Sequence, residues 1–205
     1  MKHAFAFLSL ALVAWAAPAR AQQAPAADPA LVEKYLAATF GKASPEWQAR
    51  MKPDETLETC SASRNNPSVA QAEAILQREA AKVEWPKDGV LPGNWKDGFK
   101  VANEGRGGQF SDPPGTVNGG NCYACHQMDP KELSYGTLGP SLKAYGRERK
   151  YDPDAARAAY AKIYNSQAVA VCSIMPRFGA NKVLGEQQIK DLVAYLFDPD
   201  SPVNK

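Results

Sequence analysis

The sequence predicts an all-α protein of 205 residues, in which a helical extension precedes a helical domain that surrounds one cysteine motif. Apolar residues recur at intervals of three and four along several stretches, which is the spacing of a helix face. Alternating strand patterns are scarce. A single Cys-x-x-Cys-His motif at residues 122–126 follows a stretch rich in glycine and proline, residues 105–121, which is typical of a loop.

The first residues predict export from the cytoplasm. Lys2 and His3 precede an apolar segment, residues 4–17. At about fourteen residues, that segment is too short to span a bilayer. The small residues of Ala19-Arg20-Ala21 resemble a cleavage site. We therefore expect residues 1–21 to be a cleaved signal peptide and the mature protein to be periplasmic; a membrane anchor is the weaker alternative.

Cleavage after Ala21 changes two properties of the chain. It leaves His126 as the only histidine, and it removes Lys2 and Arg20, so the formal net charge falls from +2 to 0. A neutral chain gives no indication of a nucleic-acid or anionic-membrane partner.

Five helices are expected from their start signals and apolar spacing. They begin near Asp28-Pro29, Asn66-Pro67, Trp95, Asp152-Pro153 and Glu186. The last has the i, i+3, i+4, i+7, i+8 pattern of a core-facing helix, formed by Ile189, Leu192, Val193, Leu196 and Phe197. We assign residues 22–93 to an N-terminal helical extension and residues 94–205 to the domain that carries the motif.

The motif itself indicates covalent attachment of one haem c. In an exported chain, Cys-x-x-Cys-His places two thiols to bond the haem vinyl groups and the histidine to bind the iron. Cys122, Cys125 and His126 are the residues concerned. Zinc, which needs a fourth ligand in a tetrahedron, and a dithiol redox pair are the weaker alternatives.

A second iron ligand must come from elsewhere, because no other histidine remains. Methionine is the usual alternative. Met128 is too close to His126 to reach across the haem, and Met51 lies in the extension, which leaves Met175 in the stretch CSIMPRFG. The alternative for Met175 is an ordinary core methionine. A His/Met pair leaves no open coordination position, which favours one-electron transfer.

Two further features of the sequence bear on the site. A haem-ligating histidine donates its second N–H to an acceptor, for which we expect the backbone carbonyl of Pro140 in GTLGPSL. Cys60 and Cys172 remain after haem attachment, and in an oxidising compartment we expect a disulfide between them. The alternative is that one of them is a free thiol.

Several strings then resemble a known family. GRGGQFSDPPGTVNGGNCYACHQ, YGTLGPSL, KIYNSQAVAVCSIMPRFG and DPDSPVNK are similar to the SoxX family, the monohaem cytochromes of SoxAX complexes in sulfur oxidation. The resemblance covers about residues 55–205 and implies a class I cytochrome c fold; residues 22–54 add little to it.

The resemblance also implies partners. SoxA, which carries its own haem, would form a heterodimer with this chain and perform the sulfur chemistry, so no catalytic residue is expected here. The pair would act as an L-cysteine S-thiosulfotransferase that oxidatively couples thiosulfate to a cysteine of the carrier SoxYZ. This chain would pass the electrons to a small soluble cytochrome c. We expect SoxA to cover residues 118–123 or 177–180.

Two other functions stay open from sequence. One is a free-standing electron shuttle, which has no obvious use for a disulfide-linked extension. The other is a structural haem protein whose extension anchors another chain.

Overall fold

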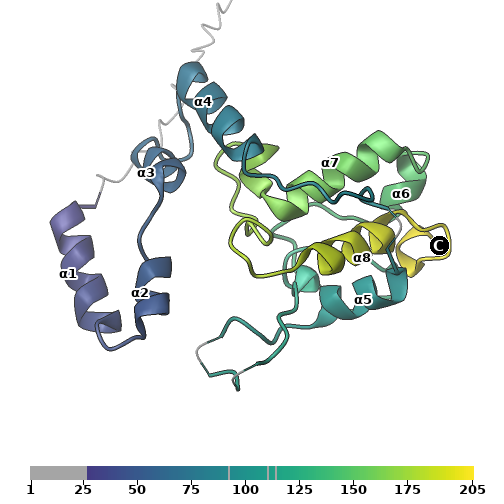
Figure 1. Cartoon of the computed structure of the whole chain (residues 1–205), viewed down its shortest axis with the longest axis horizontal. Helices are drawn as coiled ribbons and strands as arrows, with labels where there is room; N and C mark the ends of the chain where they lie inside the picture. Colours follow the sequence, from purple (N-terminus) through teal and green to yellow (C-terminus); the bar gives the residue numbers. More distant parts are fainter. Residues whose placement is uncertain (1–26, 92, 110, 114) are drawn as a thin grey trace, which may run out of the picture. The chain divides into compact units, whose positions relative to one another are not determined.

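A computed structural model describes residues 27–91, 93–109, 111–113 and 115–205 (Figure 1). Within these residues the secondary structure is helical and contains no strand, which confirms the all-α prediction. The predicted signal peptide lies outside the described residues. The chain divides into two units, residues 1–51 and 52–205.

The described part of the first unit is a pair of helices, α1 (Pro29–Phe40) and α2 (Pro45–Arg50). The Asp28 side chain caps α1 by accepting from the backbone N–H of Ala30 at 3.0 Å, as the sequence predicts. Gln48 on α2 donates to the carbonyl oxygens of Gly41 and Ala43 in the connecting turn, at 3.2 and 2.8 Å. None of the α1 side chains is buried.

The second unit holds the remaining described helices. They are α3 (Glu55–Ala62), α4 (Val69–Ala80), α5 (Trp95–Asn103), α6 (Tyr145–Glu148), α7 (Pro153–Tyr164) and α8 (Glu186–Phe197), with short 3-10 turns η1 (Cys122–Ala124), η2 (Ser166–Ala168) and η3 (Pro202–Asn204). None of the helices in the described part of the chain is both long and apolar enough to cross a bilayer.

Helix α8 forms the centre of the core, with α5 and α7 packed against it (Figure 1). Its predicted apolar face is buried throughout. Gly98 on α5 sits so close to the backbone of Asp191 on α8 that any side chain there would overlap its carbonyl oxygen. Phe99 of α5 meets Tyr195 of α8 edge to face, with ring centroids 5.8 Å apart. This contact packs α5, the helix that precedes the loop and the cysteine motif, against α8.

Helix α4 begins later than the sequence suggests. Its N-cap is Ser68, not Asn66, because Ser68 and Gln71 form a reciprocal capping box: the Gln71 side chain accepts from the Ser68 N–H at 2.9 Å. The helix ends at Ala80, six residues before Pro86. The sequence analysis also missed α2, α3 and α6, which are too short to show a helical period.

The boundary between the units differs from the one expected at residue 93. Residues 52–93 group with the cysteine-motif domain because several contacts join them. The Trp85 ring stacks on Tyr160, whose hydroxyl donates to the carbonyl oxygen of Glu84 at 3.2 Å. Asp88 pairs with the buried Lys190 at 2.7 Å. The segment is therefore an integral part of the domain.

Candidate haem site

The cysteine motif folds as a tight backbone turn. Asn121, in the left-handed region at φ 46°, leads into η1. The N–H groups of Cys125 and His126 both donate to the carbonyl oxygen of Cys122, at 3.1 and 2.9 Å. Cys122 and Cys125 are free thiols and half-buried. The turn thus presents two available thiols beside one imidazole.

The His126 ring has a fixed orientation. Its Nδ1 lies 2.7 Å from the carbonyl oxygen of Pro140, so the Nδ1–H donates there and Nε2 remains for a metal. Gly139 packs against the ring so closely that a Cβ at this position would overlap it. The N–H of Gly139 in turn donates to the carbonyl oxygen of Cys125 at 2.8 Å, which ties the loop to the motif. This is the arrangement that a haem-ligating histidine requires.

The motif is also tied to the core helix. Tyr123, between the two cysteines, is buried, and its hydroxyl lies 2.7 Å from that of Tyr195 on α8. Burial raises the pKa of both tyrosines. Both phenols therefore stay neutral near pH 7, and they hold the cysteine turn against α8.

The methionines differ in their surroundings. Met128 is 1 % exposed and belongs to the hydrophobic core, which accounts for it as a packing residue. Met175 is half-buried at the edge of the core. Its carbonyl oxygen accepts from the Ser166 hydroxyl, and its N–H donates to the Ser173 Oγ at 3.3 Å. Its backbone is thus held on both sides, while its role as an iron ligand stays a prediction.

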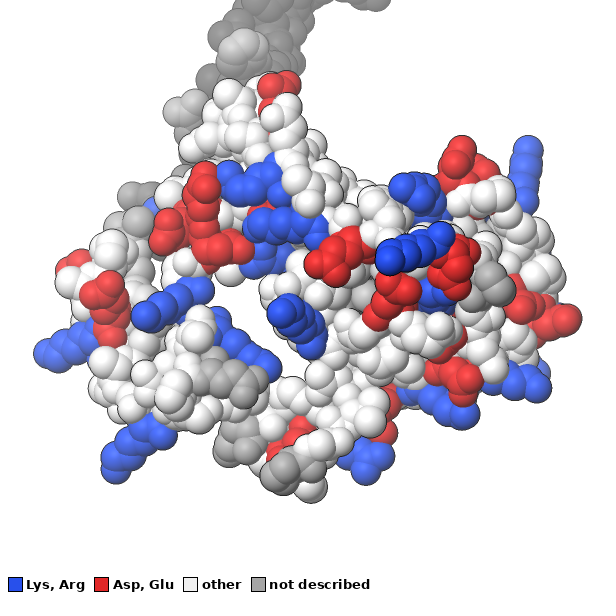
Figure 2. Space-filling view, in the orientation of Figure 1, with Lys and Arg blue, Asp and Glu red and all other residues white. Residues whose placement is uncertain are grey.

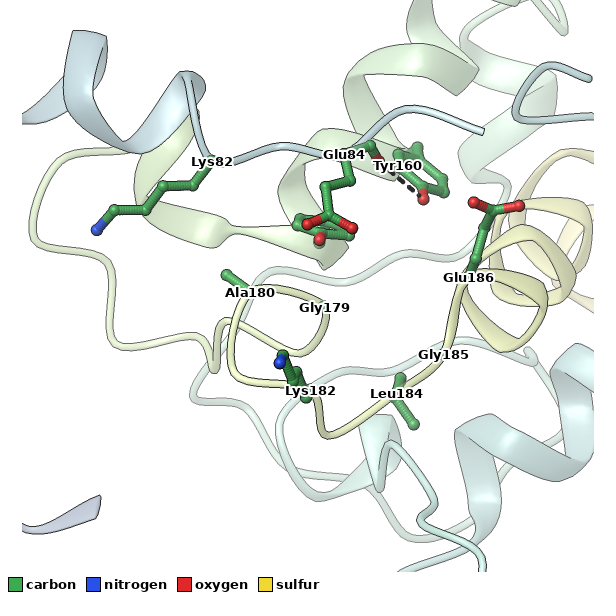
Figure 3. A pocket seen from close by; sticks show the side chains of 10 residues that line it. Lys82, Glu84, Tyr160, Gly179, Ala180, Lys182, Leu184, Gly185 and Glu186 are labelled. Atoms are coloured by element: carbon green, nitrogen blue, oxygen red, sulfur yellow. Dashed lines mark hydrogen bonds between the residues drawn. The ribbon is translucent and has the colours of Figure 1, made fainter. Parts of the chain in front are cut away.

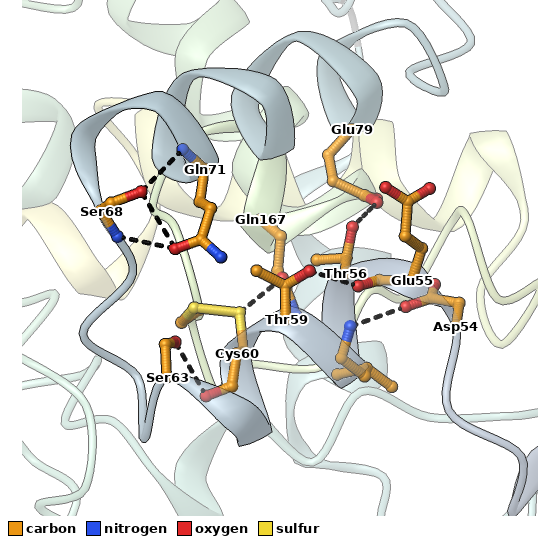
Figure 4. Close-up of a disulfide and its surroundings, with 12 residues drawn as sticks. Asp54, Glu55, Thr56, Thr59, Cys60, Ser63, Ser68, Gln71, Glu79 and Gln167 are labelled. Atoms are coloured by element: carbon orange, nitrogen blue, oxygen red, sulfur yellow. Dashed lines mark hydrogen bonds between the residues drawn. A yellow bond between two sulfur atoms is a disulfide. The ribbon is translucent and has the colours of Figure 1, made fainter.

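The structure contains a disulfide between Cys60 on α3 and Cys172, three residues before Met175 (Figure 4). Its two residues are buried, at 4 % and 9 % exposure, and pack with Ile75 of α4. Neither sulfur is therefore a free thiol, which leaves no support for the alternative reading of these cysteines. The bond links α3 to the loop that carries Met175.

The residues around the motif fit a covalently bound haem. The two free thiols of the turn and the oriented imidazole are the groups that covalent haem attachment requires. Two large apolar side chains close in sequence to the candidate ligands are exposed: Leu138 before the Gly139-Pro140 turn, at 70 %, and Ile174 before Met175, at 69 %. When bound, the haem supplies one-electron redox chemistry, and the protein supplies attachment, ligands and a low-dielectric surrounding.

The two alternatives to haem find little support. Among the described residues, no three His, Cys, Asp or Glu side chains are grouped so that they could hold a metal ion, so a tetrahedral zinc site is not apparent. Burial raises the pKa of the Cys122 thiol to about 12. A reactive dithiol pair requires the opposite, a lowered pKa.

A cavity of about 460 Å³ is lined in part by Gly179 and Ala180, but by none of the four predicted haem residues. Figure 3 shows Glu84 and Tyr160 on one side of it and the loop of Gly179 and Ala180 on the other. On the face in Figure 2, both basic and acidic side chains are present. This agrees with the near-neutral charge of the chain.

Comparison with known proteins agrees with this geometry. An "Uncharacterized lipoprotein" of Aquifex aeolicus (strain VF5) is 32 % identical over 207 residues, which cover 97 % of this chain and 96 % of that protein. Residues 115–198 match the cytochrome c family. The chain belongs to one family with this lipoprotein and carries a cytochrome c domain. The fold is therefore that of a class I cytochrome c, as predicted, and the domain indicates covalently bound haem c and a role in electron transfer.

The sequence analysis missed one feature of this cytochrome c domain. Arg177, two residues after Met175, forms an ion pair with Glu79 inside the protein. Nothing in the sequence distinguishes Glu79 from other acidic residues on amphipathic helices, because its burial depends on a partner about a hundred residues away.

Proposed function

We propose that this protein is the electron-transfer subunit of a periplasmic SoxAX-type complex. One haem c is bound through Cys122 and Cys125, with His126 and Met175 as the axial ligands of the iron. The observation that carries the haem assignment is the cysteine turn with its histidine fixed on Pro140. The assignment to sulfur oxidation rests on the SoxX-like strings around these residues.

In this proposal the chain performs no sulfur chemistry. A closed His/Met coordination lets the iron change charge with little reorganisation. The partner SoxA would couple thiosulfate to the SoxYZ cysteine as an L-cysteine S-thiosulfotransferase, and the electrons would pass through this haem to a small soluble cytochrome c. The signal-peptide pattern supports a periplasmic location, as does the relative, because lipoproteins are exported proteins.

Side-chain exposure differs between the two stretches proposed for the SoxA contact. Of the two stretches expected from sequence, residues 177–180 are mostly internal: Arg177 and Phe178 are each 8 % exposed. Asn121 is exposed, as is Val117 at 74 %. We therefore favour residues 118–123, with the exposed Val117 beside them, for the SoxA contact, and expect a stable interface of more than roughly 1,200 Å² in total.

Co-purification tests this proposal. The mature protein should elute from size exclusion together with SoxA, and thiosulfate should reduce its haem only when both SoxA and SoxYZ are present. Elution as a free monomer beside intact SoxA, with thiosulfate-dependent cytochrome reduction that proceeds without this chain, would contradict it. The chain would then be a free-standing shuttle.

A further inference from the structure

The side chain of Glu79 on α4 is completely buried, at 0 % exposure. Its carboxylate accepts from the Thr56 hydroxyl at 2.6 Å, the Lys82 ammonium at 2.7 Å and the Asn165 amide at 2.8 Å (Figure 4 shows the Thr56 bond). An ionised acid is stable in such a place only if partners replace the lost water. These contacts provide that replacement.

Arg177 connects Glu79 to residues 172–177, the methionine segment. Its guanidinium, 9 % exposed, lies 2.6 Å from a carboxylate oxygen of Asp54 and 3.4 Å from one of Glu79. Asp54 also caps α3 by accepting from the N–H of Leu57 at 2.9 Å. The arginine two residues after Met175 therefore bonds two acids on residues 54–79, upstream of the region that matches the cytochrome c family.

The methionine segment is held on its other side as well. The disulfide fixes Cys172 to α3. Asn165, which bonds Glu79, is followed by Ser166, whose hydroxyl donates to the carbonyl oxygen of Met175. Residues 172–177 are thus anchored at their start, middle and end, and two of these three anchors are groups on residues 54–79.

We propose that a charge network, formed by the buried Glu79 and Arg177 and the half-exposed Asp54, positions Met175 toward the haem iron. The inference rests on the proposed function, in which Met175 is the sixth ligand. Buried ion pairs add little net stability compared with apolar residues, but they fix geometry, because breaking one leaves a charge without a partner. The network therefore keeps the methionine segment closed and resists replacement of the thioether by an outside ligand. This assigns a role to residues 54–79, for which the sequence suggests none.

Imidazole binding to the ferric haem measures this closure, because imidazole must displace the methionine to reach the iron. Asp54→Asn removes one carboxylate from Arg177 while asparagine retains the helix cap. Asp88→Asn is the matched control, because Asp88 also pairs with a buried cation, Lys190, at 2.7 Å, but does not contact the methionine segment. We expect Asp54→Asn to raise the imidazole affinity at least about tenfold, and Asp88→Asn to change it less than twofold.

A second variant, Glu79→Gln, keeps the shape of the side chain and removes its charge, so its effect on imidazole affinity should equal or exceed that of Asp54→Asn. Met175→Ala, measured in parallel, separates two failures. If Met175→Ala keeps the methionine–iron charge-transfer band, the ligand assignment is wrong. If Met175→Ala loses the band, two results would show that the positioning role is wrong while the proposed function stands. One is that both network variants bind imidazole no more tightly than the wild type; the other is that Asp88→Asn binds imidazole as tightly as the network variants do.

Discussion

The Nδ1 atom of His126 lies 2.7 Å from the carbonyl oxygen of Pro140, and Gly139 lies directly against the same ring. A histidine held in this way presents Nε2 in one direction without the entropic cost of fixing a free side chain. The turn that follows the cysteine motif therefore fixes the direction of the Nε2 atom that the proposed haem site offers to the iron.

Gly139→Ala should disrupt this arrangement. The added methyl overlaps the His126 ring, and because Pro140 restrains the turn, the ring must move. We expect a loss of about 1–3 kcal/mol in the free energy of unfolding, typical of overpacking, and a smaller fraction of chain with haem attached. Gly185→Ala is the control, because a Cβ there meets only the end of the Gln188 side chain at 3.8 Å. Equal behaviour of the two variants would contradict the role of this turn.

Covalent haem attachment predicts a simple chemical result. The denatured protein should retain one haem through acid–acetone extraction, with a mass equal to the mature chain plus one haem. Replacing both Cys122 and Cys125 by alanine should release the haem into the acetone, while the cysteines of the disulfide should have no influence. Haem that extracts from the wild-type protein, or zinc in its place, would rule out the haem c assignment.

Met175→Ala should abolish the long-wavelength methionine–iron charge-transfer band and lower the reduction potential, because the thioether favours the ferrous state. Met128→Leu is the appropriate control: Met128 is a core residue at 1 % exposure, and a change of similar volume costs less than about 1.5 kcal/mol. The control should leave the band and the potential unchanged. A band that survives in Met175→Ala would show that another group binds the iron.

The disulfide should account for a substantial share of the stability. The residues that it links are 112 positions apart. Replacing Cys60 and Cys172 by alanine is therefore expected to lower the free energy of unfolding in urea by about 2–4 kcal/mol. In native, unreduced protein neither cysteine should react with an alkylating reagent. Alkylation of both, at full native structure, would contradict the bond.

Local signals were sufficient to predict the helices that carry the fold. Asp28 and Asp152 cap the helices that they were expected to start. The apolar face of residues 189–197 is buried as its spacing predicts. Short helices such as α6 (Tyr145–Glu148) were missed, because four residues contain little more than one turn and show no period.

Long-range relationships were predictable only where chemistry limits the choices. Two cysteines left over in an exported chain can form one bond, so Cys60 and Cys172 could be paired from the sequence. No such limit applies to Glu79 and Arg177, since many acids and bases could pair. The same reason explains the boundary: residues 52–93 show no motif of their own, and only their contacts join them to the domain.

The buried Glu79 should make stability depend on pH. Burial by itself raises the pKa of Glu79, but the hydrogen bonds from Asn165, Lys82 and Thr56 outweigh it and lower the pKa from 4.5 to about 2. Because the folded state holds this proton less tightly than the unfolded chain does, the ionised Glu79 stabilises the fold above about pH 4.5. That contribution is lost as the pH falls from 4.5 toward 2.

Urea unfolding between pH 6 and the acid limit of the fold measures this contribution. The wild-type free energy of unfolding should decrease below pH 4.5 by an amount on the order of 2 kcal/mol, and Glu79→Gln should not show this decrease. The amount is smaller than the full pKa shift implies, because the side chain of Lys82, which pairs with Glu79, is 42 % exposed to water. At pH 6 the variant should be less stable than the wild type, and the difference should shrink as the pH falls, because protonated Glu79 and glutamine are alike in charge.

Glu55→Gln is the control: the Glu55 side chain is 73 % exposed in its pair with Arg78, so this variant should follow the wild-type curve. Parallel curves for the wild type and Glu79→Gln over the whole range would show that Glu79 is not held as an ionised group inside the protein.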